Sequence, residues 1–172
     1  MDIESLIRTV PDFPKAGIRF KDITPLLSNG RALRHVVDTM AERYRGNVDA
    51  IVGVESRGFL FGAPVAYALG VGLCIVRKPG KLPHDTHTVT YALEYGKDSL
   101  EIHKDALRPG ARVAIVDDLL ATGGTAKAAI TLAEACGANV VECGFLIELE
   151  FLKGRAALAP VPVHSLLQYN GD

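Results

Sequence analysis

Short apolar runs alternate with amphipathic stretches along most of this 172-residue chain. Helical spacing predicts a helix near 31–45 with one apolar face, made by Leu33, Val36, Val37, Met40 and Tyr44. Ser28-Asn29-Gly30 supplies cap chemistry in front of it. Helices are also predicted at 58–69 and 124–136, and buried strands at 49–54, 73–76, 112–116, 139–149 and 163–167. This alternation predicts an α/β fold with a parallel central sheet flanked by helices on both faces.

Two segments interrupt the alternation. Pro11, Pro14 and Gly17 mark an irregular N-terminal arm, and the polar segment 78–93, broken by prolines and a glycine, predicts a long loop or hairpin. We expect a single domain over 1–172, without repeats or linkers. Ligands of parallel α/β sheets bind at the carboxyl ends of the strands. The predicted site therefore lies at three loops, 55–58, 77–98 and 117–124.

One uncharged segment, 58–76, is long enough to span a bilayer. Gly62, Pro64, Gly70 and Gly72 interrupt it, which favours a buried helix, a glycine break and a strand. The acidic N-terminus has no apolar region typical of a secretory signal. We therefore expect a soluble, cytoplasmic protein that makes no contact with a membrane.

Composition narrows the classes of partner. Nineteen Lys and Arg residues against 20 Asp and Glu give a net charge of −1, without the broad positive field that nucleic-acid binding requires. Aromatic residues make up only 6% of the chain, too few for a base-stacking surface. Cys74, Cys136 and Cys143 are odd in number and lie among apolar residues, which indicates free buried thiols in a reducing compartment.

The most informative segment is 113–125, VAIVDDLLATGGT. A predicted buried strand ends at Asp117 and Asp118, and a Thr-Gly-Gly-Thr turn then opens a helix. Glycines let backbone N–H groups approach an anion, threonine hydroxyls add donors, and the helix N-terminus attracts negative charge. Adjacent carboxylates repel a phosphate unless the ligand also presents hydroxyl donors. A ribose 5-phosphate has both groups, so it fits this segment.

Two other interpretations compete for this segment. It resembles a Walker-B strand, but the sequence contains no G-x-x-x-x-G-K-[ST] motif to go with it. An ordinary capping turn would explain the threonines and one glycine, but not two acids at a strand end. His84 and His87 suggest a metal site, but a pair at this spacing without a third ligand nearby is more typical of solvated histidines.

Segment 113–125 resembles the phosphoribosyl pyrophosphate (PRPP) motif of the type I phosphoribosyltransferases. Further segments are similar to the adenine phosphoribosyltransferases among them, and lie at 11–14, 20–25, 55–59, 77–83 and 93–96. The resemblance runs from about Ile3 to the C-terminus. Ala16, Lys21 and the 84–87 stretch depart from the family pattern, and of these only Lys21, where arginine is common, lies near a predicted site.

The resemblance implies transfer of the phosphoribosyl group of PRPP to adenine, giving AMP and pyrophosphate in purine salvage. It implies Mg²⁺ brought by PRPP, without direct protein ligands, and a homodimer. The residues it assigns to PRPP and AMP are Asp117, Asp118, Ala121, Thr122, Gly123, Gly124 and Thr125. Those it assigns to pyrophosphate are Ser56, Arg57, Arg77, Lys78 and Lys81. It also suggests a non-proline cis peptide within 55–58.

Catalysis is expected from Glu94 and Arg57, with Glu94 as the general acid/base for the adenine ring proton and Tyr95 as a shield against water. Without the resemblance, Glu94 would be interpreted as an exposed loop residue. The resemblance also assigns adenine to Phe20, Lys21 and Leu119, although a core Phe and Leu would look the same in the sequence. Residues 1–30 would then form a short base-binding hood, and 78–98 a flexible catalytic loop.

Two alternatives stay open. The same PRPP site would serve a transferase for xanthine, hypoxanthine or guanine. A non-catalytic regulator that senses PRPP or a nucleotide would share the fold, but a helix-turn-helix extension or a basic face would be expected of it. The sequence shows neither feature, and candidate residues for all three parts of the substrates favour catalysis.

Overall fold

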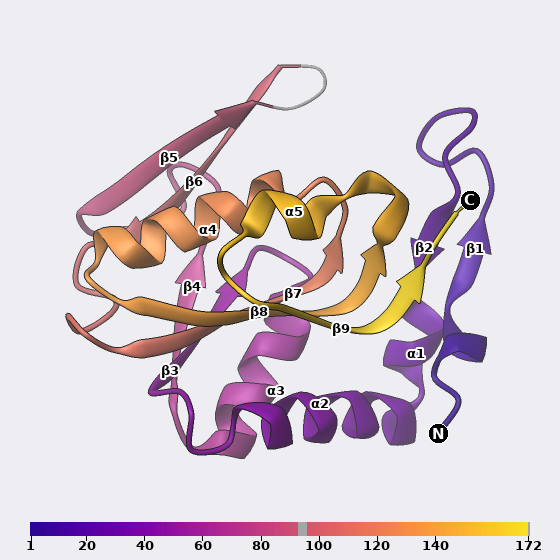
Figure 1. The fold of residues 1–172 in the computed structure, drawn as a ribbon, viewed down its shortest axis with the longest axis horizontal. Coiled ribbons are helices and arrows are strands. Elements are labelled where there is room, and N and C mark those ends of the chain that lie inside the picture. The colour runs from indigo at the N-terminus through magenta and orange to yellow at the C-terminus, as the bar shows by residue number, and fades with distance from the viewer. Residues whose placement is uncertain (93–95, 172) are drawn as a thin grey trace.

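The computed structural model describes residues 1–92 and 96–171 and is built on a parallel five-stranded sheet with helices on both faces (Figure 1). The strand order is β4-β3-β7-β8-β9. The strands are β3 (Ala50–Val54), β4 (Gly72–Val76), β7 (Arg112–Leu120), β8 (Asn139–Leu149) and β9 (Val163–Tyr169). Every pair of neighbours in this sheet is parallel. The predicted fold class is confirmed.

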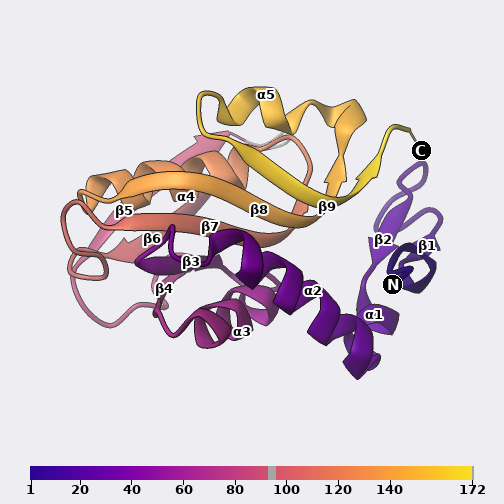
Figure 2. The ribbon, with the colours of Figure 1, turned by 60° about the horizontal axis from the view of Figure 1, so that its bottom comes forward.

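Helices cover the two faces separately, as Figure 2 shows. On one face lie α2 (Gly30–Tyr44) and α3 (Phe59–Leu69), and on the other α4 (Gly124–Ala135) and α5 (Gly154–Leu158). Each face has its own buried apolar cluster. The Asn29 side chain accepts hydrogen bonds from the amides of Arg31 and Ala32, which confirms the predicted cap of α2.

The uncharged segment 58–76 forms the helix α3 and the strand β4, as expected. Gly70 ends α3 in the left-handed region at a φ of 68°, which glycine adopts without strain. None of the helices formed by residues 1–92 and 96–171 is both long and apolar enough to cross a membrane. The three cysteines are free and buried.

Two antiparallel hairpins lie outside the central sheet. The first joins β1 (Arg8–Val10) to β2 (Phe20–Asp22) and was not expected from the sequence. The second joins β5 (Thr86–Ala92) to β6 (Lys97–His103), so the polar segment after β4 includes a hairpin, whose second strand runs to residue 103. Short elements complete the chain: η1 (Glu4–Leu6), α1 (Thr24–Ser28) and η2 (Glu150–Leu152).

The predicted end of β7 was wrong. The sequence predicts an apolar strand at 112–116 with the two acids at its end, but the strand continues past them to Leu120. It continues because β8 offers partners along its whole length, with Leu119 opposite Ile147 and Leu120 opposite Glu148. Asp117 and Asp118 therefore belong to the regular part of β7, which fixes their backbone more firmly than a loop would.

Candidate active site

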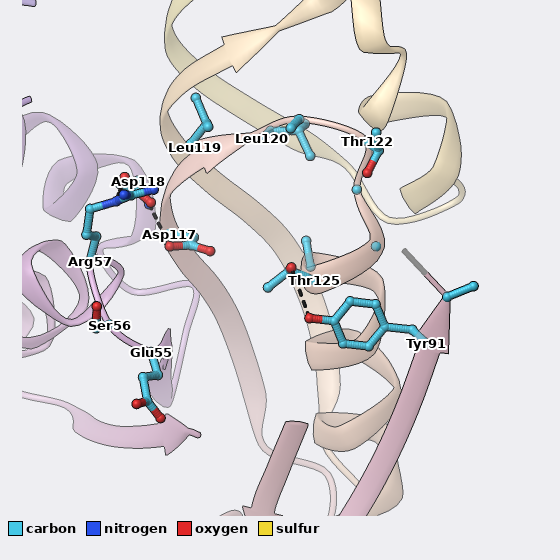
Figure 3. Close-up of a pocket in the computed structure, with 15 residues that line it drawn as sticks. Glu55, Ser56, Arg57, Tyr91, Asp117, Asp118, Leu119, Leu120, Thr122 and Thr125 are labelled. Carbon is cyan, nitrogen blue, oxygen red and sulfur yellow. Dashed lines mark hydrogen bonds and ion pairs between the residues drawn. The ribbon is translucent and has the colours of Figure 1, made fainter. Parts of the chain in front are cut away.

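A cavity of about 390 Å³ opens where β3 and β7 end (Figure 3). Its walls come from the segment after β3, the end of β5, the end of β7, and the turn that leads from β7 into the first residues of α4. The lining residues are Glu55, Ser56, Arg57, Tyr91, Ala92, Asp117, Asp118, Leu119, Leu120, Ala121, Thr122, Gly123, Gly124, Thr125 and Ala126. All the residues predicted to bind PRPP and AMP are among them, together with Ser56, Arg57 and Leu119 from the other predicted groups.

The turn before α4 has the geometry of an anion site. Gly123 caps the helix at a φ of 90°, and α4 begins at Gly124. Backbone N–H groups of a first helical turn have no partner within the helix, so they are available to a ligand. A Cβ on Gly123 would lie 2.8 Å from the carbonyl oxygen of Gly154, and one on Gly154 would lie 2.2 Å from that of Ala121. The turn is therefore braced against α5 by two close backbone approaches.

The two acids of β7 lie in different surroundings. Asp117 is buried, and its Oδ1 accepts a hydrogen bond of 2.8 Å from the Asp118 amide. Burial, together with the neighbouring charge of Asp118, raises the pKa of the Asp117 carboxyl well above its usual value. The Asp118 carboxylate accepts a 2.5 Å hydrogen bond from Arg57 Nε, which ties β7 to the segment after β3.

The segment after β3 is packed very closely. The Glu55–Ser56 peptide is cis, which confirms the expected non-proline cis bond. A Cβ on Gly58 would lie 2.4 Å from the Val54 carbonyl oxygen and 2.8 Å from Asp117 Oδ1. Only glycine fits between this strand end and the carboxylate.

Gly58→Ala is expected to lower the free energy of unfolding by about 1–3 kcal/mol or more, because the added methyl group displaces the backbone or Asp117. Chemical denaturation monitored by circular dichroism measures this change. Gly30→Ala is the matched control, because nothing lies within 4 Å of a Cβ at that position. If the Gly58 variant were as stable as the Gly30 variant, the close packing described here would be wrong.

Three of the four cations predicted for pyrophosphate, Arg77, Lys78 and Lys81, are paired with carboxylates that the sequence did not single out. Glu55 accepts from Arg77 Nε at 3.2 Å, from the Lys78 amide at 2.8 Å and from Lys81 Nζ. Burial would raise the pKa of Glu55, but the hydrogen bonds from Lys81, Lys78 and Arg77 outweigh it and lower the pKa to about 2. The side chain of Lys78 instead donates to Asp98 of β6.

The residues expected at adenine are only partly brought together. Leu119 lines the cavity, and the Phe20 ring lies 5.6 Å from the guanidinium carbon of Arg57. Phe13 meets Phe20 edge to face, with ring centroids 5.2 Å apart. Lys21 donates to Thr9 at 3.1 Å and its Nζ lies 4.1 Å from the Tyr169 ring centroid. Leu119 thus lines the cavity and Phe20 lies beside Arg57, another lining residue, whereas these Lys21 contacts involve β1 and the last strand.

Two predicted residues, Glu94 and Tyr95, lie outside the described part of the chain. Five lining residues were not among the predicted ones, namely Glu55, Tyr91, Ala92, Leu120 and Ala126. The Tyr91 hydroxyl lies 3.2 Å from both Thr125 Oγ1 and Asp98 Oδ2. Alternation along β5 and β6 could have placed Tyr91 and Asp98 on one face, but their pairing depends on a hairpin register that the sequence leaves open.

Known proteins match almost the whole chain. The phosphoribosyl transferase domain family matches residues 22–160. The adenine phosphoribosyltransferase of Roseiflexus sp. strain RS-1 is 60% identical over 169 residues, which cover 98% of each chain. The enzyme of the same name from Thermoanaerobacter pseudethanolicus is 53% identical in a crystal structure, with a TM-score of 0.95 and 98% of each chain covered.

A third relative was crystallised with ligands. The adenine phosphoribosyltransferase of Saccharomyces cerevisiae, in complex with an imino-altritol bisphosphate and adenine, is 45% identical, with a TM-score of 0.91 over 96% of this chain and 97% of that one. The parallel sheet, with a cavity at its carboxyl edge, agrees with these matches. The chain therefore belongs to the phosphoribosyl transferase family and, within it, to the adenine phosphoribosyltransferases, which are pentosyltransferases.

Proposed function

We propose that the cavity at the ends of β3 and β7 is where the chain transfers the 5-phosphoribosyl group of PRPP to adenine, giving AMP and pyrophosphate. One observation carries this proposal. A glycine turn with free N–H donors and a pair of carboxylates line the same 390 Å³ cavity, so donors for a phosphate and acceptors for hydroxyls face one ligand.

The phosphate and ribose would bind at the end of β7. Residues 122–125 would hold the 5-phosphate through backbone N–H groups and the hydroxyls of Thr122 and Thr125, with Ala121 as part of the same turn. Asp117 and Asp118 would accept hydrogen bonds from the 2′- and 3′-hydroxyls of the ribose. Arg57 holds the Asp118 carboxylate in place for this role.

The pyrophosphate would bind between the segment after β3 and the loop after β4. Ser56 and Arg57 line the cavity, and Arg77, Lys78 and Lys81 lie around Glu55 and Asp98 beside it. These cations would stabilise the negative charge that develops on the leaving pyrophosphate. Arg57 would act on both parts of the substrate, because it reaches Asp118 and belongs to the proposed pyrophosphate site.

Mg²⁺ would arrive with PRPP. It prefers oxygen ligands, keeps several waters and binds through one or two carboxylates plus substrate phosphates. In residues 1–92 and 96–171 no group of three or more His, Cys, Asp or Glu side chains is suited to hold a metal ion. The carboxylates of Asp117 and Asp118 suit its water ligands. When bound, the ion neutralises charge on the diphosphate.

Adenine would lie between Phe20 and Leu119, with Lys21 nearby. As N9 forms its bond to the anomeric carbon, the bond from that carbon to the pyrophosphate oxygen breaks. The ring proton of adenine would pass to Glu94 as general base, and Tyr95 would help to keep water from the ribosyl centre. In this proposal the hood is residues 1–30 and the catalytic loop is residues 78–98.

A parallel assay of pyrophosphate release tests the function. With PRPP and Mg²⁺ present, we expect turnover with adenine and little with hypoxanthine or guanine. Absence of turnover with every base would rule out the enzymatic function and favour a PRPP-sensing regulator. Turnover confined to guanine or hypoxanthine would keep the PRPP site and reject the assignment of the base.

We also propose that the chain acts as a homodimer in the cytoplasm. Large apolar side chains are exposed on α3 and on the neighbouring edge strand β4, namely Leu60, Tyr67 and Leu73. Tyr67 is 89% exposed, which is unusual for a large aromatic residue. A second copy of the chain would cover this face.

A further inference from the structure

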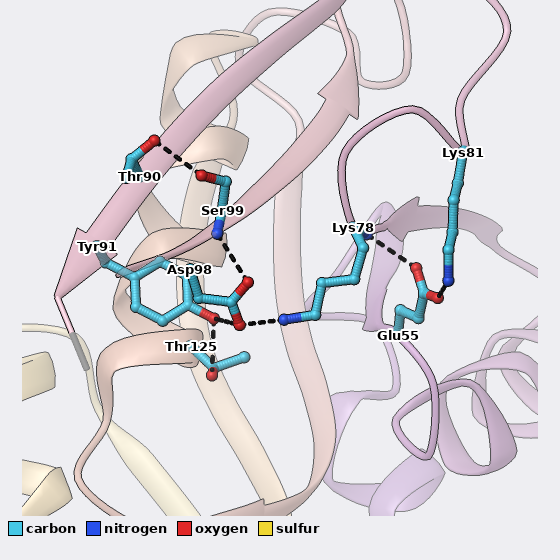
Figure 4. Close-up of polar contacts among 8 residues, drawn as sticks. All are labelled: Glu55, Lys78, Lys81, Thr90, Tyr91, Asp98, Ser99 and Thr125. Atoms are coloured by element: carbon cyan, nitrogen blue, oxygen red, sulfur yellow. Dashed lines mark hydrogen bonds and ion pairs between the residues drawn. The ribbon is translucent and has the colours of Figure 1, made fainter. Parts of the chain in front are cut away.

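Asp98 joins the two proposed anion sites through one carboxylate group (Figure 4). It lies opposite Tyr91 in the β5–β6 hairpin. Its Oδ2 accepts hydrogen bonds from Lys78 Nζ and from the Tyr91 hydroxyl, and that hydroxyl also lies 3.2 Å from Thr125 Oγ1. Lys78 belongs to the proposed pyrophosphate site, and Thr125 to the proposed 5-phosphate turn.

The direction of these hydrogen bonds follows from the chemistry of Asp98. The hydrogen bond from Lys78 lowers the pKa of Asp98, so the carboxyl group is ionised and only accepts. Tyr91 therefore donates its proton to Asp98. Its oxygen is then an acceptor for Thr125, whose proton points at Tyr91 rather than at the turn.

Packing holds this arrangement in place. The Tyr91 ring lies against the first residue of α4, since a Cβ on Gly124 would be 3.3 Å from Tyr91 Cδ2. The second Asp98 oxygen accepts a 2.8 Å hydrogen bond from the Ser99 amide. The carboxylate is thus fixed between Lys78, which pyrophosphate would also use, and Tyr91, which contacts the Thr125 hydroxyl that the 5-phosphate would use.

We propose that Asp98 is an affinity-determining residue for both ends of PRPP, because its carboxylate competes with pyrophosphate for Lys78 and, through Tyr91, with the 5-phosphate for Thr125. This inference rests on the proposed function. When PRPP binds, Lys78 leaves the Asp98 carboxylate for the pyrophosphate group, and the Thr125 hydroxyl turns its proton from Tyr91 to the 5-phosphate. Asp98 therefore weakens the binding of the substrate and of both products.

Three variants separate the effect of Asp98 on Lys78 from its effect, through Tyr91, on Thr125. Asp98→Asn keeps the shape of the side chain but removes its charge, Tyr91→Phe keeps the ring on Gly124 but removes the hydroxyl, and Thr90→Val is the control. Thr90 lies one position from Tyr91 and pairs with Ser99 at 2.8 Å, away from Thr125 (Figure 4). Isothermal titration with pyrophosphate and with AMP, both at fixed Mg²⁺, gives the dissociation constants.

We expect Asp98→Asn to tighten pyrophosphate binding about fivefold, the factor for an ion pair of about 1 kcal/mol, and to tighten AMP binding by a smaller factor. It should also lower KM for PRPP without raising kcat. Tyr91→Phe should tighten AMP binding and leave pyrophosphate binding unchanged, and Thr90→Val should change neither. Unchanged or weaker binding of both ligands by the Asp98 variant would overturn the inference, as would weaker AMP binding by Tyr91→Phe.

Thr125→Val distinguishes a failure of this inference from a failure of the proposed function. Weaker AMP binding by this variant, together with no tightening in Asp98→Asn or Tyr91→Phe, rejects the role of Asp98 alone. Unchanged AMP binding by Thr125→Val rejects the proposed phosphate turn, and with it the role of Asp98.

Discussion

Asp118→Asn is expected to lower kcat/KM for PRPP by about 10²-fold, because one or two hydrogen bonds to a charged group are lost at about 1.5–3 kcal/mol each. One is the proposed bond from a ribose hydroxyl, and the other is the 2.5 Å bond from Arg57. Asp117→Asn should act in the same direction. Its amide oxygen can still accept from the Asp118 amide, and a neutral group suits this buried position, so the fold should persist.

Steady-state kinetics together with titration of PRPP measure the effect. Asp49→Asn is the matched control, because Asp49 is also paired with an arginine, Arg112, but just before β3, at the opposite end from the cavity. This control should leave kcat/KM unchanged. If both Asp117→Asn and Asp118→Asn bound PRPP as the unmodified chain does, the proposed contacts to the ribose hydroxyls would be wrong.

Glu94→Gln is expected to lower kcat by about 10²–10⁴-fold, the usual contribution of a positioned acid or base. Glutamine keeps the length and polarity of the side chain but cannot take up the adenine ring proton. The loss should fall on kcat, while the affinities for PRPP and AMP stay near their original values. A plot of kcat against pH should also no longer show the change in rate that accompanies ionisation of this carboxyl group.

Glu134→Gln is the control for this variant, because Glu134 is an exposed carboxylate on α4. A Glu94→Gln variant with kcat within about threefold of the control would reject proton transfer by Glu94, since that transfer accounts for at least about 10²-fold. Reduced affinity for PRPP at unchanged kcat would instead assign Glu94 to substrate binding.

The central sheet and its helices could be predicted from the sequence because their signals are local. Continuous apolar runs gave β3, β4 and β8, and Asn29 and Gly70 marked helix ends through their own cap chemistry. The β1–β2 hairpin has no such signal. Each of its strands has three residues, none of them fully buried, so neither composition nor alternation distinguishes it from an irregular arm.

The cavity is lined by residues of the three loops that the sequence singled out, but the partners of its charged residues could not be predicted. Glu55 stands in a predicted segment, yet its contacts with Arg77 and Lys81 depend on how the loop after β4 returns over the strand end. Asp98 and Tyr91 are seven positions apart and meet only through the hairpin register. Such pairings depend on three-dimensional structure, which motifs of adjacent residues do not contain.

The reactivity of the buried cysteines can show when the core becomes exposed to solvent. Cys74, Cys136 and Cys143 all belong to the apolar cluster beneath α4. Burial raises the pKa of the Cys74 and Cys143 thiols to about 12, so almost no reactive thiolate exists in the folded state at neutral pH. Alkylation of these thiols, followed over time by mass spectrometry, would therefore record transient exposure of this side of the sheet without any engineered label.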